Sequence, residues 1–323
     1  MREVLPELLA WWENGETVGV GTVVATFQSA PRPPGASMLV GPDESAVGSV
    51  SGGCVEGAVY ELGQSVVESG EPVLQRYGIS DDDAFAVGLT CGGILDVFVE
   101  RVSKDTFPEL GEIAADARGM LAAGRTAQMH VGHDGERRGD DLTLFVNSFA
   151  PAARMVVFGA IDFAAAVARV GAFLGYRVTV CDARPVFATR SRFPEADEVV
   201  VDWPHRYLQA EQDAGRIDQR TVIAVLTHDP KFDVPLLEVA LRLPEVAYVG
   251  AMGSRRTHDD RLERLREAGV TEKEVDRLSS PIGLDLGART PEETAISIAA
   301  EIVALQWGGS GDRLGTRDGR IHH

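Results

Sequence analysis

The sequence is poor in cysteine, in positive charge and in long apolar runs, and each shortage excludes a class of protein. Only three cysteines, Cys54, Cys91 and Cys181, occur in 323 residues, which is too few for a disulfide scaffold. Lys and Arg number 31 against 49 Asp and Glu, a net charge of −18. That charge argues against a nucleic acid or an anionic membrane surface as partner. No apolar run approaches the ~20 residues of a membrane helix, so we expect no membrane association.

The N-terminal stretch also lacks the features of a secretory leader, because residues 1–12 are too short and too charged for one. We therefore expect a cytoplasmic protein. In that reducing compartment the cysteines should be thiols that are available for chemistry. The remaining composition, with 44% hydrophobic and 25% charged residues, is that of an ordinary globular protein.

Length and a change of pattern predict two domains of α/β class. A chain of 323 residues exceeds what one core usually organises. Residues 1–150 are expected to form a mixed α/β domain. Over 151–307 short apolar strands alternate with helices, beginning with a βαβ unit, which predicts a Rossmann-like domain with a parallel sheet. Residues 308–323 have little to bury and are expected to form a mobile tail.

The hydrophobic pattern predicts the individual elements of both domains. In the first domain we expect strands over 18–26, 38–40, 73–78 and 94–100, a helix over 55–70 and a hairpin around 132–139. In the second we expect strands over 155–158, 177–182, 198–201, 221–226 and 246–250, with helices over 163–174, 203–214, 230–243 and 256–269.

The last helix has a well-marked beginning. Thr290 is its expected N-cap, Pro291 stands at the first helical position and Glu293 completes a capping box. Its core stripe is expected to comprise Ala295, Ile298, Ala299, Ile302 and Leu305.

Two glycine-flanked cysteines are the main chemical signal of the first domain. Ser51-Gly52-Gly53-Cys54 precedes a predicted helix, and Cys91-Gly92-Gly93 precedes a predicted strand. Double glycine lets backbone adopt positive φ and approach a ligand closely, and the start of a helix favours a thiolate. We interpret the two loops as one site, with Cys54 and Cys91 as the candidates for chemistry. The alternative is that both are buried structural cysteines.

Other residues of the first domain have weaker signals. Two cysteines without a Cys-x-x-Cys motif or a nearby His pair fall short of the four ligands of a structural zinc site. Glu56 is either a residue that orients a ligand or an ordinary first-turn acid that suits the helix dipole. Arg32 and Arg76 are candidate anion partners or solvated surface residues. Cys181, in the second domain, is expected to lie in the core.

The first loop of the Rossmann-like domain departs from the dinucleotide-binding pattern. That pattern is Gly-x-Gly-x-x-Gly/Ala, whereas the chain has Gly159-Ala160-Ile161-Asp162-Phe163-Ala164. The bulk of Ile161 and the negative charge of Asp162 oppose a pyrophosphate. Asp182 nevertheless ends the second strand, where a ribose-binding acid would lie. NAD(P) stays a cofactor to consider, but Ile161 and Asp162 weaken it.

The carboxyl ends of later strands offer further candidates, because ligands of open α/β sheets bind beyond those ends. His228 follows the fourth predicted strand; the alternative is an exposed histidine beside Asp229, a helix cap. Gly253, Ser254 and Arg255 follow the fifth strand, where a hydroxyl and a cation can hold a phosphate at a helix start. The alternative there is a solvated arginine.

Several motifs in order resemble the XdhC/CoxI family, the accessory proteins of xanthine dehydrogenase and carbon monoxide dehydrogenase. The resembling stretches are 29–38, 48–56 and 87–93 in the first domain, and 227–229, 250–255 and 281–293 in the second. They span nearly the whole chain. One departure concerns the first glycine loop, which in the family reads Gly-Ala-Gly-His and here ends in Ile161 and Asp162.

The resemblance implies a chaperone with no turnover of its own. It would bind the molybdenum cofactor (molybdopterin), support its sulfuration by a cysteine desulfurase and insert it into an apo molybdenum hydroxylase of the xanthine dehydrogenase type. Cys54 and Cys91 would contact the molybdenum or its sulfur, with the phosphate held by backbone near Gly52 or by Ser254 and Arg255. A homodimer is expected.

Two other functions stay open at this point. One is an NAD(P)-dependent oxidoreductase or a xanthine dehydrogenase component. The absence of iron–sulfur cysteine sets argues against it. The other is a non-catalytic regulatory or structural partner, which would tolerate substitution of both cysteine loops.

Overall fold

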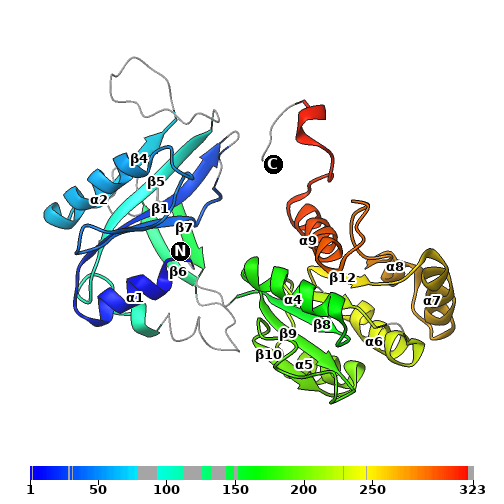
Figure 1. Ribbon diagram of the computed structural model, residues 1–323. Helices are drawn as coiled ribbons and strands as arrows, with labels where there is room; N and C mark the ends of the chain where they lie inside the picture. Colours follow the sequence, from blue (N-terminus) through cyan, green and yellow to red (C-terminus); the bar gives the residue numbers. More distant parts are fainter. Residues whose placement is uncertain are drawn as a thin grey trace. The chain divides into compact units, whose positions relative to one another are not determined.

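A computed structural model of the protein is shown in Figure 1. It describes residues 1, 3–27, 30, 32–78, 93–112, 126–131, 143–148, 152–227, 229–244 and 246–318. The chain divides into two compact units, an N-terminal unit, Met1–Pro151, and a C-terminal unit, Ala152–Arg317. Each unit has its own central sheet.

The N-terminal unit is built on a five-stranded antiparallel sheet with the order β3-β2-β1-β5-β4. Its strands are β1 (Val18–Phe27), β2 (Ser37–Val40), β3 (Ala46–Gly48), β4 (Val73–Tyr77) and β5 (Ile94–Val102). Among the described residues two helices accompany the sheet, α1 (Leu5–Glu13) and α2 (Glu56–Ser69), and α2 packs on β5, β1 and β2. A separate antiparallel pair, β6 (Thr126–Val131) and β7 (Thr143–Ser148), flanks residues 132–139, where a hairpin is predicted and which lie outside the described residues.

The C-terminal unit is a Rossmann domain, because its six strands are all parallel and follow the order β10-β9-β8-β11-β12-β13. The strands are β8 (Arg154–Phe158), β9 (Arg177–Asp182), β10 (Glu198–Val201), β11 (Val222–Val225), β12 (Tyr248–Ala251) and β13 (Leu278–Ser279). The helices are α4 (Asp162–Phe173), α5 (Pro204–Asp213), α6 (Pro230–Arg242), α7 (Arg255–Glu267), α8 (Glu272–Val275) and α9 (Pro291–Trp307), followed by a 3-10 turn at Leu314–Thr316.

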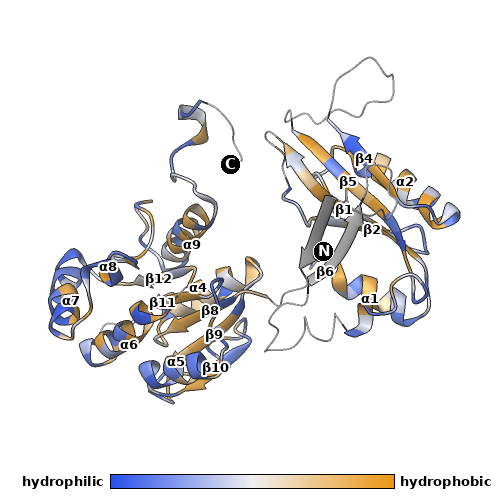
Figure 2. Ribbon diagram, turned by 180° about the vertical axis from the view of Figure 1, so that it is seen from behind, coloured by the Kyte–Doolittle hydropathy of each residue, from blue (hydrophilic) through white to orange (hydrophobic). Residues whose placement is uncertain are grey.

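Both faces of this parallel sheet are covered, as the continuous apolar runs of its strands require. One buried cluster joins the sheet to α4 and α9 and includes Val157, Ala164 and Ile298. The other joins the opposite face to α5 and α6 and includes Tyr207 and Leu237. Strands β5, β8 and β9 are largely orange, the apolar colour, in Figure 2. None of the helices in the described part of the chain is long and apolar enough to cross a membrane.

The predicted α/β class and the Rossmann-like domain are confirmed. The capping box that joins Thr290 and Glu293 is present at the start of α9. The elements that sequence missed, β3, α8 and β13, have only three, four and two residues, too few for a periodic pattern. The core position predicted for Leu305 is wrong, because its side chain is 60% exposed. The buried stripe of α9 ends one turn earlier, at Ile302.

Candidate functional site

One end of the N-terminal sheet gathers the loops that carry the predicted residues of this unit. β1, β4 and β3 end there, and β5 and β2 begin there, as the antiparallel registers require. The connections that leave this end are residues 28–36, 49–55 and 78–93. Arg32, Cys54 and Gly93 belong to these three connections. The topology therefore brings together segments that are far apart in sequence.

The carboxylate of Glu56 organises the loop before α2. Its Oε1 accepts hydrogen bonds from the backbone N–H groups of Ser51 and Gly52 at 2.9 and 3.0 Å, and from the Ser49 hydroxyl at 2.6 Å. Its Oε2 accepts from the Gly53 N–H at 2.8 Å and from the Ser51 hydroxyl at 2.5 Å. The loop is thus wrapped around one of its own side chains.

This network fixes the charge of Glu56. Partial burial opposes ionisation, but the hydrogen bonds from Ser49, Ser51 and the loop backbone outweigh it and lower the pKa of Glu56 to about 2. Glu56 is therefore ionised throughout the neutral range. It is also the first residue of α2, where the helix dipole favours a negative charge.

The two glycines of this loop present open backbone. Gly52 and Gly53 have φ of +82° and +119°, a conformation that other residues adopt only with strain. Both are exposed, and a Cβ built on either one would meet nothing within 4 Å. Their positive φ values favour glycine, but no neighbouring atom would clash with a side chain at either position. A flat ligand can consequently approach this stretch of backbone.

Cys54 follows the two glycines directly. Its N–H donates to the Ser51 hydroxyl at 2.9 Å, and its half-buried side chain packs against the apolar cluster that includes Val55 and Tyr77. Val55 is the N-cap of α2, so Cys54 lies two residues before the first helical residue. The predicted position of Cys54 beside a helix start is confirmed.

The second cysteine loop is only partly described. Cys91 and Gly92 lie outside the described residues, and Gly93 immediately precedes β5. A Cβ on Gly78, which follows β4, would lie 2.2 Å from the Gly93 carbonyl oxygen. The two ends of the connection that carries Cys91 are therefore in close contact.

The two arginines of this unit have different partners. Arg76 forms a two-point ion pair with Asp96, at 2.5 and 2.7 Å, which leaves it poorly suited to a ligand anion. Arg32 pairs through Nη2 with the exposed Glu3 at 2.6 Å. Its buried Nε has no hydrogen-bond partner within the described part of the chain. Arg32 thus retains donor capacity.

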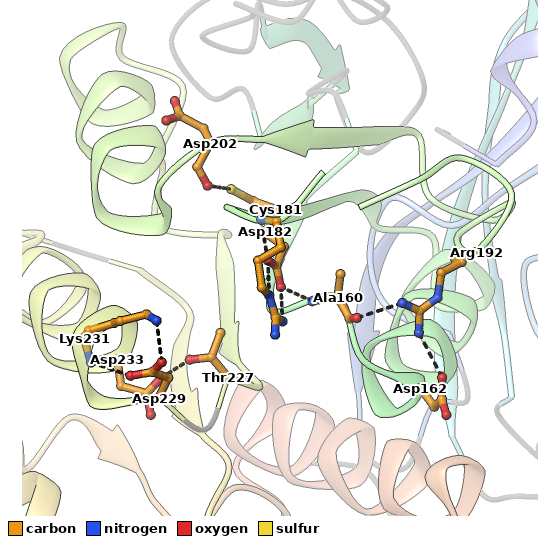
Figure 3. Close-up of polar contacts among 11 residues, drawn as sticks. Ala160, Asp162, Cys181, Asp182, Arg192, Asp202, Thr227, Asp229, Lys231 and Asp233 are labelled. Carbon is orange, nitrogen blue, oxygen red and sulfur yellow. Dashed lines mark hydrogen bonds and ion pairs between the residues drawn. The ribbon is translucent and has the colours of Figure 1, made fainter. Parts of the chain in front are cut away.

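Side chains from the end of β9 and from the segment after it contact the first loop of the C-terminal unit (Figure 3). The Ala160 N–H donates to Asp182 Oδ2 at 2.7 Å. Arg192 donates to the Ala160 carbonyl at 3.3 Å and pairs with Asp162 at 3.1 Å. Ile161 is the N-cap of α4 and Asp162 its first residue. The Ala160 N–H therefore already has a partner, and the carboxylate of Asp162 stands at the start of α4.

Asp182, at the position of a ribose-binding acid, is likewise engaged. Burial opposes its ionisation, but hydrogen bonds from Arg184 and from the Ala160 N–H lower its pKa. Arg184 reaches both carboxylate oxygens, at 2.9 and 2.7 Å. Cys181, the preceding residue, is fully buried as predicted. Burial and the nearby carboxylates of Asp202 and Asp182 raise its pKa.

The candidate residues after β12 stand at a helix start, and the candidate after β11 is not described. His228 lies outside the described residues, and its neighbour Asp229 caps α6 by accepting from the Lys231 N–H at 3.1 Å. Ser254 caps α7 by accepting from the Thr257 N–H at 3.1 Å, and Arg255 is the first residue of that helix and is exposed. Gly253 immediately precedes the cap.

Sequence reasoning missed a buried ion pair that joins these loops. Arg261 on α7 and Asp233 on α6 are both buried, with 3.1 Å between Arg261 Nη2 and Asp233 Oδ2. Arg261 also donates to the Met252 carbonyl at 2.7 Å and to the Ser280 hydroxyl at 3.0 Å, and Asp233 accepts from the Thr227 hydroxyl. The pair ties together the ends of β11 and β12. Only a charged residue on the apolar face of each helix could have indicated it.

Asp233 is the strongly shifted carboxyl group of this pair. Burial raises its pKa to about 6, although the neighbouring Arg261 opposes the shift. Among the described residues no group of three or more His, Cys, Asp or Glu side chains is arranged to hold a metal ion.

Comparison with known proteins places these features in a family. The chain is 28% identical to a probable xanthine dehydrogenase subunit of Bacillus subtilis, over 90% of this chain and 94% of the relative. It is also 28% identical to the molybdenum cofactor insertion chaperone PaoD of Escherichia coli, over 91% of this chain and 85% of the relative.

A solved structure has the same fold over nearly the whole length. The crystal structure of a xanthine dehydrogenase from Bacillus halodurans superposes with a TM-score of 0.74 and 24% identity, covering 98% of each chain. Residues 11–78 match the XdhC and CoxI family, and residues 155–302 match the XdhC Rossmann domain. Together the two matches cover about two thirds of the chain, and the chain belongs to the XdhC and CoxI family.

Proposed function

We propose that this protein is a chaperone of the molybdenum cofactor, which it binds, protects during sulfuration and inserts into an apo molybdenum hydroxylase. Family membership and the relative named as a molybdenum cofactor insertion chaperone support this role. The cofactor is cargo in this proposal, so binding is stoichiometric and the protein has no turnover of its own.

The observation that carries the proposal is the exposed Gly52-Gly53 backbone beside Cys54, held in place by Glu56. Molybdopterin combines a soft metal–sulfur centre with a flat, polar pterin. A thiolate suits the first, and open backbone suits the second. We propose that Cys54 and Cys91 contact the molybdenum or its sulfur, while Gly52, Gly53, Gly92 and Gly93 allow the close approach.

Glu56 changes how the phosphate is assigned. The N–H groups of Ser51, Gly52 and Gly53 already donate to its carboxylate, so they are poor candidates for a second anion. In the N-terminal unit we assign that role to Arg32, whose Nε lacks a partner among the described residues. Ser254 and Arg255 are the corresponding candidates of the C-terminal unit, together with Gly253 and His228.

The proposal includes the partners that this role requires. A cysteine desulfurase supplies the terminal sulfur, and an apo hydroxylase of the xanthine dehydrogenase type receives the finished cofactor. We further propose a homodimer that works in the cytoplasm.

Titration with cofactor tests the cysteine assignment. Purified protein is loaded anaerobically, and binding is followed by pterin fluorescence for the wild type, Cys54→Ser, Cys91→Ser and Cys181→Ser. Wild type and Cys181→Ser should bind one cofactor per chain, and the other two variants should lose about tenfold or more in affinity. Unchanged affinity and unchanged sulfur transfer in both Cys54→Ser and Cys91→Ser would reject the assignment.

An NAD(P)-dependent oxidoreductase is the second candidate, because the C-terminal unit has the Rossmann strand order. The engaged Ala160 N–H and Asp182 carboxylate argue against it. Titration with NADH under the same conditions separates the two functions: the chaperone proposal predicts no saturable change in nicotinamide fluorescence, and the oxidoreductase predicts micromolar binding.

A further inference from the structure

The outer face of α9 is unusual for a helix on the surface of an acidic protein. Ile296, Val303 and Trp307 are 54%, 40% and 60% exposed. Their spacing of seven and four residues puts them on one face of the helix. The opposite face, with Ala295, Ile298 and Ile302, is buried in the core. This helix is therefore apolar on both sides.

The stretch that contains this face is also almost free of charge. One quarter of all residues in the chain are charged, yet residues 294–311 contain a single charged side chain, Glu301. Glu301 accepts hydrogen bonds from the Tyr248 hydroxyl and from the Gly283 N–H, the latter at 2.8 Å. Its carboxylate is thereby held by the C-terminal unit itself. No charge interrupts the row of Ile296, Val303 and Trp307.

Physical chemistry predicts that such a face is covered. A helix that is apolar all round is normally buried on all sides, and contiguous exposed apolar patches mark interaction surfaces. Here α4 and the sheet cover one side of α9.

We propose that the outer face of α9 is the surface at which two copies of this chain meet. Each copy has a net charge of −18, so most surfaces of the protein would repel their own counterparts. A two-fold interface places the same patch against itself, which an uncharged apolar face tolerates and an acidic face does not. The absence of charge selects a second copy over a partner recognised by opposite charge.

The residues of the face suit a self-complementary contact. Ala300 lies between Ile296 and Val303 and is small enough to let two helices approach closely. Trp307 supplies the kind of large side chain that dominates interface energy. Leu286 and Leu314 are also exposed. Leu284 lies beside α9, because its N–H donates to the Ser297 carbonyl at 3.2 Å, and a Cβ on Gly311 would lie 3.1 Å from Leu284.

This inference deepens the homodimer of the proposed function, and its test is independent of cofactor binding. The oligomeric state of the full chain is measured by sedimentation velocity from about 0.5 to 50 μM. Val303→Glu places two like charges at the interface, and Val186→Glu adds the same charge at a site on the C-terminal unit that is 73% exposed. We expect a dimeric wild type, a dimeric Val186→Glu, and a dissociation constant at least tenfold higher for Val303→Glu.

Three results would overturn the inference: a monomeric wild type at all concentrations, a Val303→Glu variant as dimeric as the wild type, or equal dissociation of both variants. Circular dichroism checks that each variant is folded. Should Val303→Glu not fold, Ala300→Gln adds bulk to the face without charge and takes its place in the same comparison. A monomer that still binds cofactor stoichiometrically would reject the dimer surface and leave the chaperone proposal standing.

Discussion

The two units contain the same local device, a glycine loop followed by a helix whose first residue is an acid, and they use it in opposite ways. Before α2, Glu56 turns back and accepts the N–H groups of its own loop. Before α4, Asp162 points outward, 85% exposed, and pairs with Arg192. The loop N–H of Ala160 is instead taken by Asp182 from the next strand.

The difference shows that a glycine loop at a helix start does not by itself identify a ligand site. In the N-terminal unit the carboxylate of Glu56 accepts the N–H groups of the loop, so the backbone of Gly52 and Gly53 is exposed and the half-buried Cys54 follows it directly. In the C-terminal unit Gly159 is covered, since a Cβ there would lie 2.9 Å from Thr227. The exposed glycine loop is therefore the one that carries Cys54. The covered glycine loop is the one that occupies the dinucleotide-binding position of the Rossmann domain.

The largest expected effect concerns the thiols of the two units. In a Cys91→Ser background, Cys54 should react with an alkylating reagent ~1,000-fold faster than Cys181 or more, because Cys181 is fully buried and reacts only when the domain opens. Mass spectrometry of quenched samples measures both rates. In guanidinium chloride the two rates should converge; comparable rates in the native protein would contradict the described burial.

Alanine substitution of Gly159 and of Gly53 should separate the cost of backbone strain from the cost of a steric clash. Gly159→Ala combines positive φ with a clash against Thr227 and should cost about 3 kcal/mol of unfolding free energy. Gly53→Ala meets only the strain and should cost about 1 kcal/mol. Urea unfolding of both variants measures this. Gly53→Ala alone should also weaken cofactor binding; equal stability losses with no effect on binding would remove the distinction.

Glu56 and Asp162, the acids at the two helix starts, should also contribute differently to the free energy of unfolding. Glu56→Gln removes a carboxylate that accepts several hydrogen bonds and should lower the unfolding free energy by about 2 kcal/mol. Asp162→Asn removes an exposed ion pair and should change it by less than about 0.5 kcal/mol. Denaturant unfolding of the wild type and the two variants measures both changes. A neutral Glu56→Gln would show that the loop does not depend on this residue.

The pH dependence of stability should have opposite signs in the two units. The native pKa of Glu56 is lowered to about 2, so its stabilisation is present above the unfolded pKa of ~4.3 and is lost as the pH falls toward 2. The native pKa of Asp233 is raised to about 6, so its ionisation opposes folding, and stability falls as the pH rises from about 4 to about 6.

Comparing wild type with Glu56→Gln and Asp233→Asn isolates the two contributions. The Glu56→Gln difference should shrink on acidification below about pH 4, and Asp233→Asn should flatten the decline between about pH 4 and 6. Parallel pH profiles for all three proteins would show that neither carboxyl group is shifted as described.

Sequence reasoning succeeded where periodicity or capping chemistry decides the structure. The alternation of short apolar strands and helices predicted the Rossmann domain, and Thr290 with Glu293 predicted the start of α9. The two helix-start acids had no such signal. The sequence allows Glu56 to be a ligand-orienting residue or an ordinary first-turn acid. Its hydrogen bonds to the loop depend on the backbone conformation of Ser51 and Gly53.

Contacts between distant residues also escaped prediction for a physical reason. Asp233 on α6 and Arg261 on α7 form an ion pair between two helices. The residues next to each in the sequence do not indicate that its charge is buried. Leu305 continues the periodic stripe of α9 but lies beyond the end of the core, which only the tertiary structure sets. Local patterns thus predicted the elements, while side-chain partners required the fold.

Cofactor insertion is the measurement that tests the central claim most directly. Wild-type protein, Cys54→Ser and Cys181→Ser are incubated anaerobically with sulfurated cofactor and then mixed with an apo molybdenum hydroxylase, whose activity is followed. The chaperone account predicts activation in proportion to the wild type and Cys181→Ser added, little activation by Cys54→Ser, and no substrate turnover by the protein alone. Equal activation by Cys54→Ser, or turnover without the hydroxylase, would contradict it.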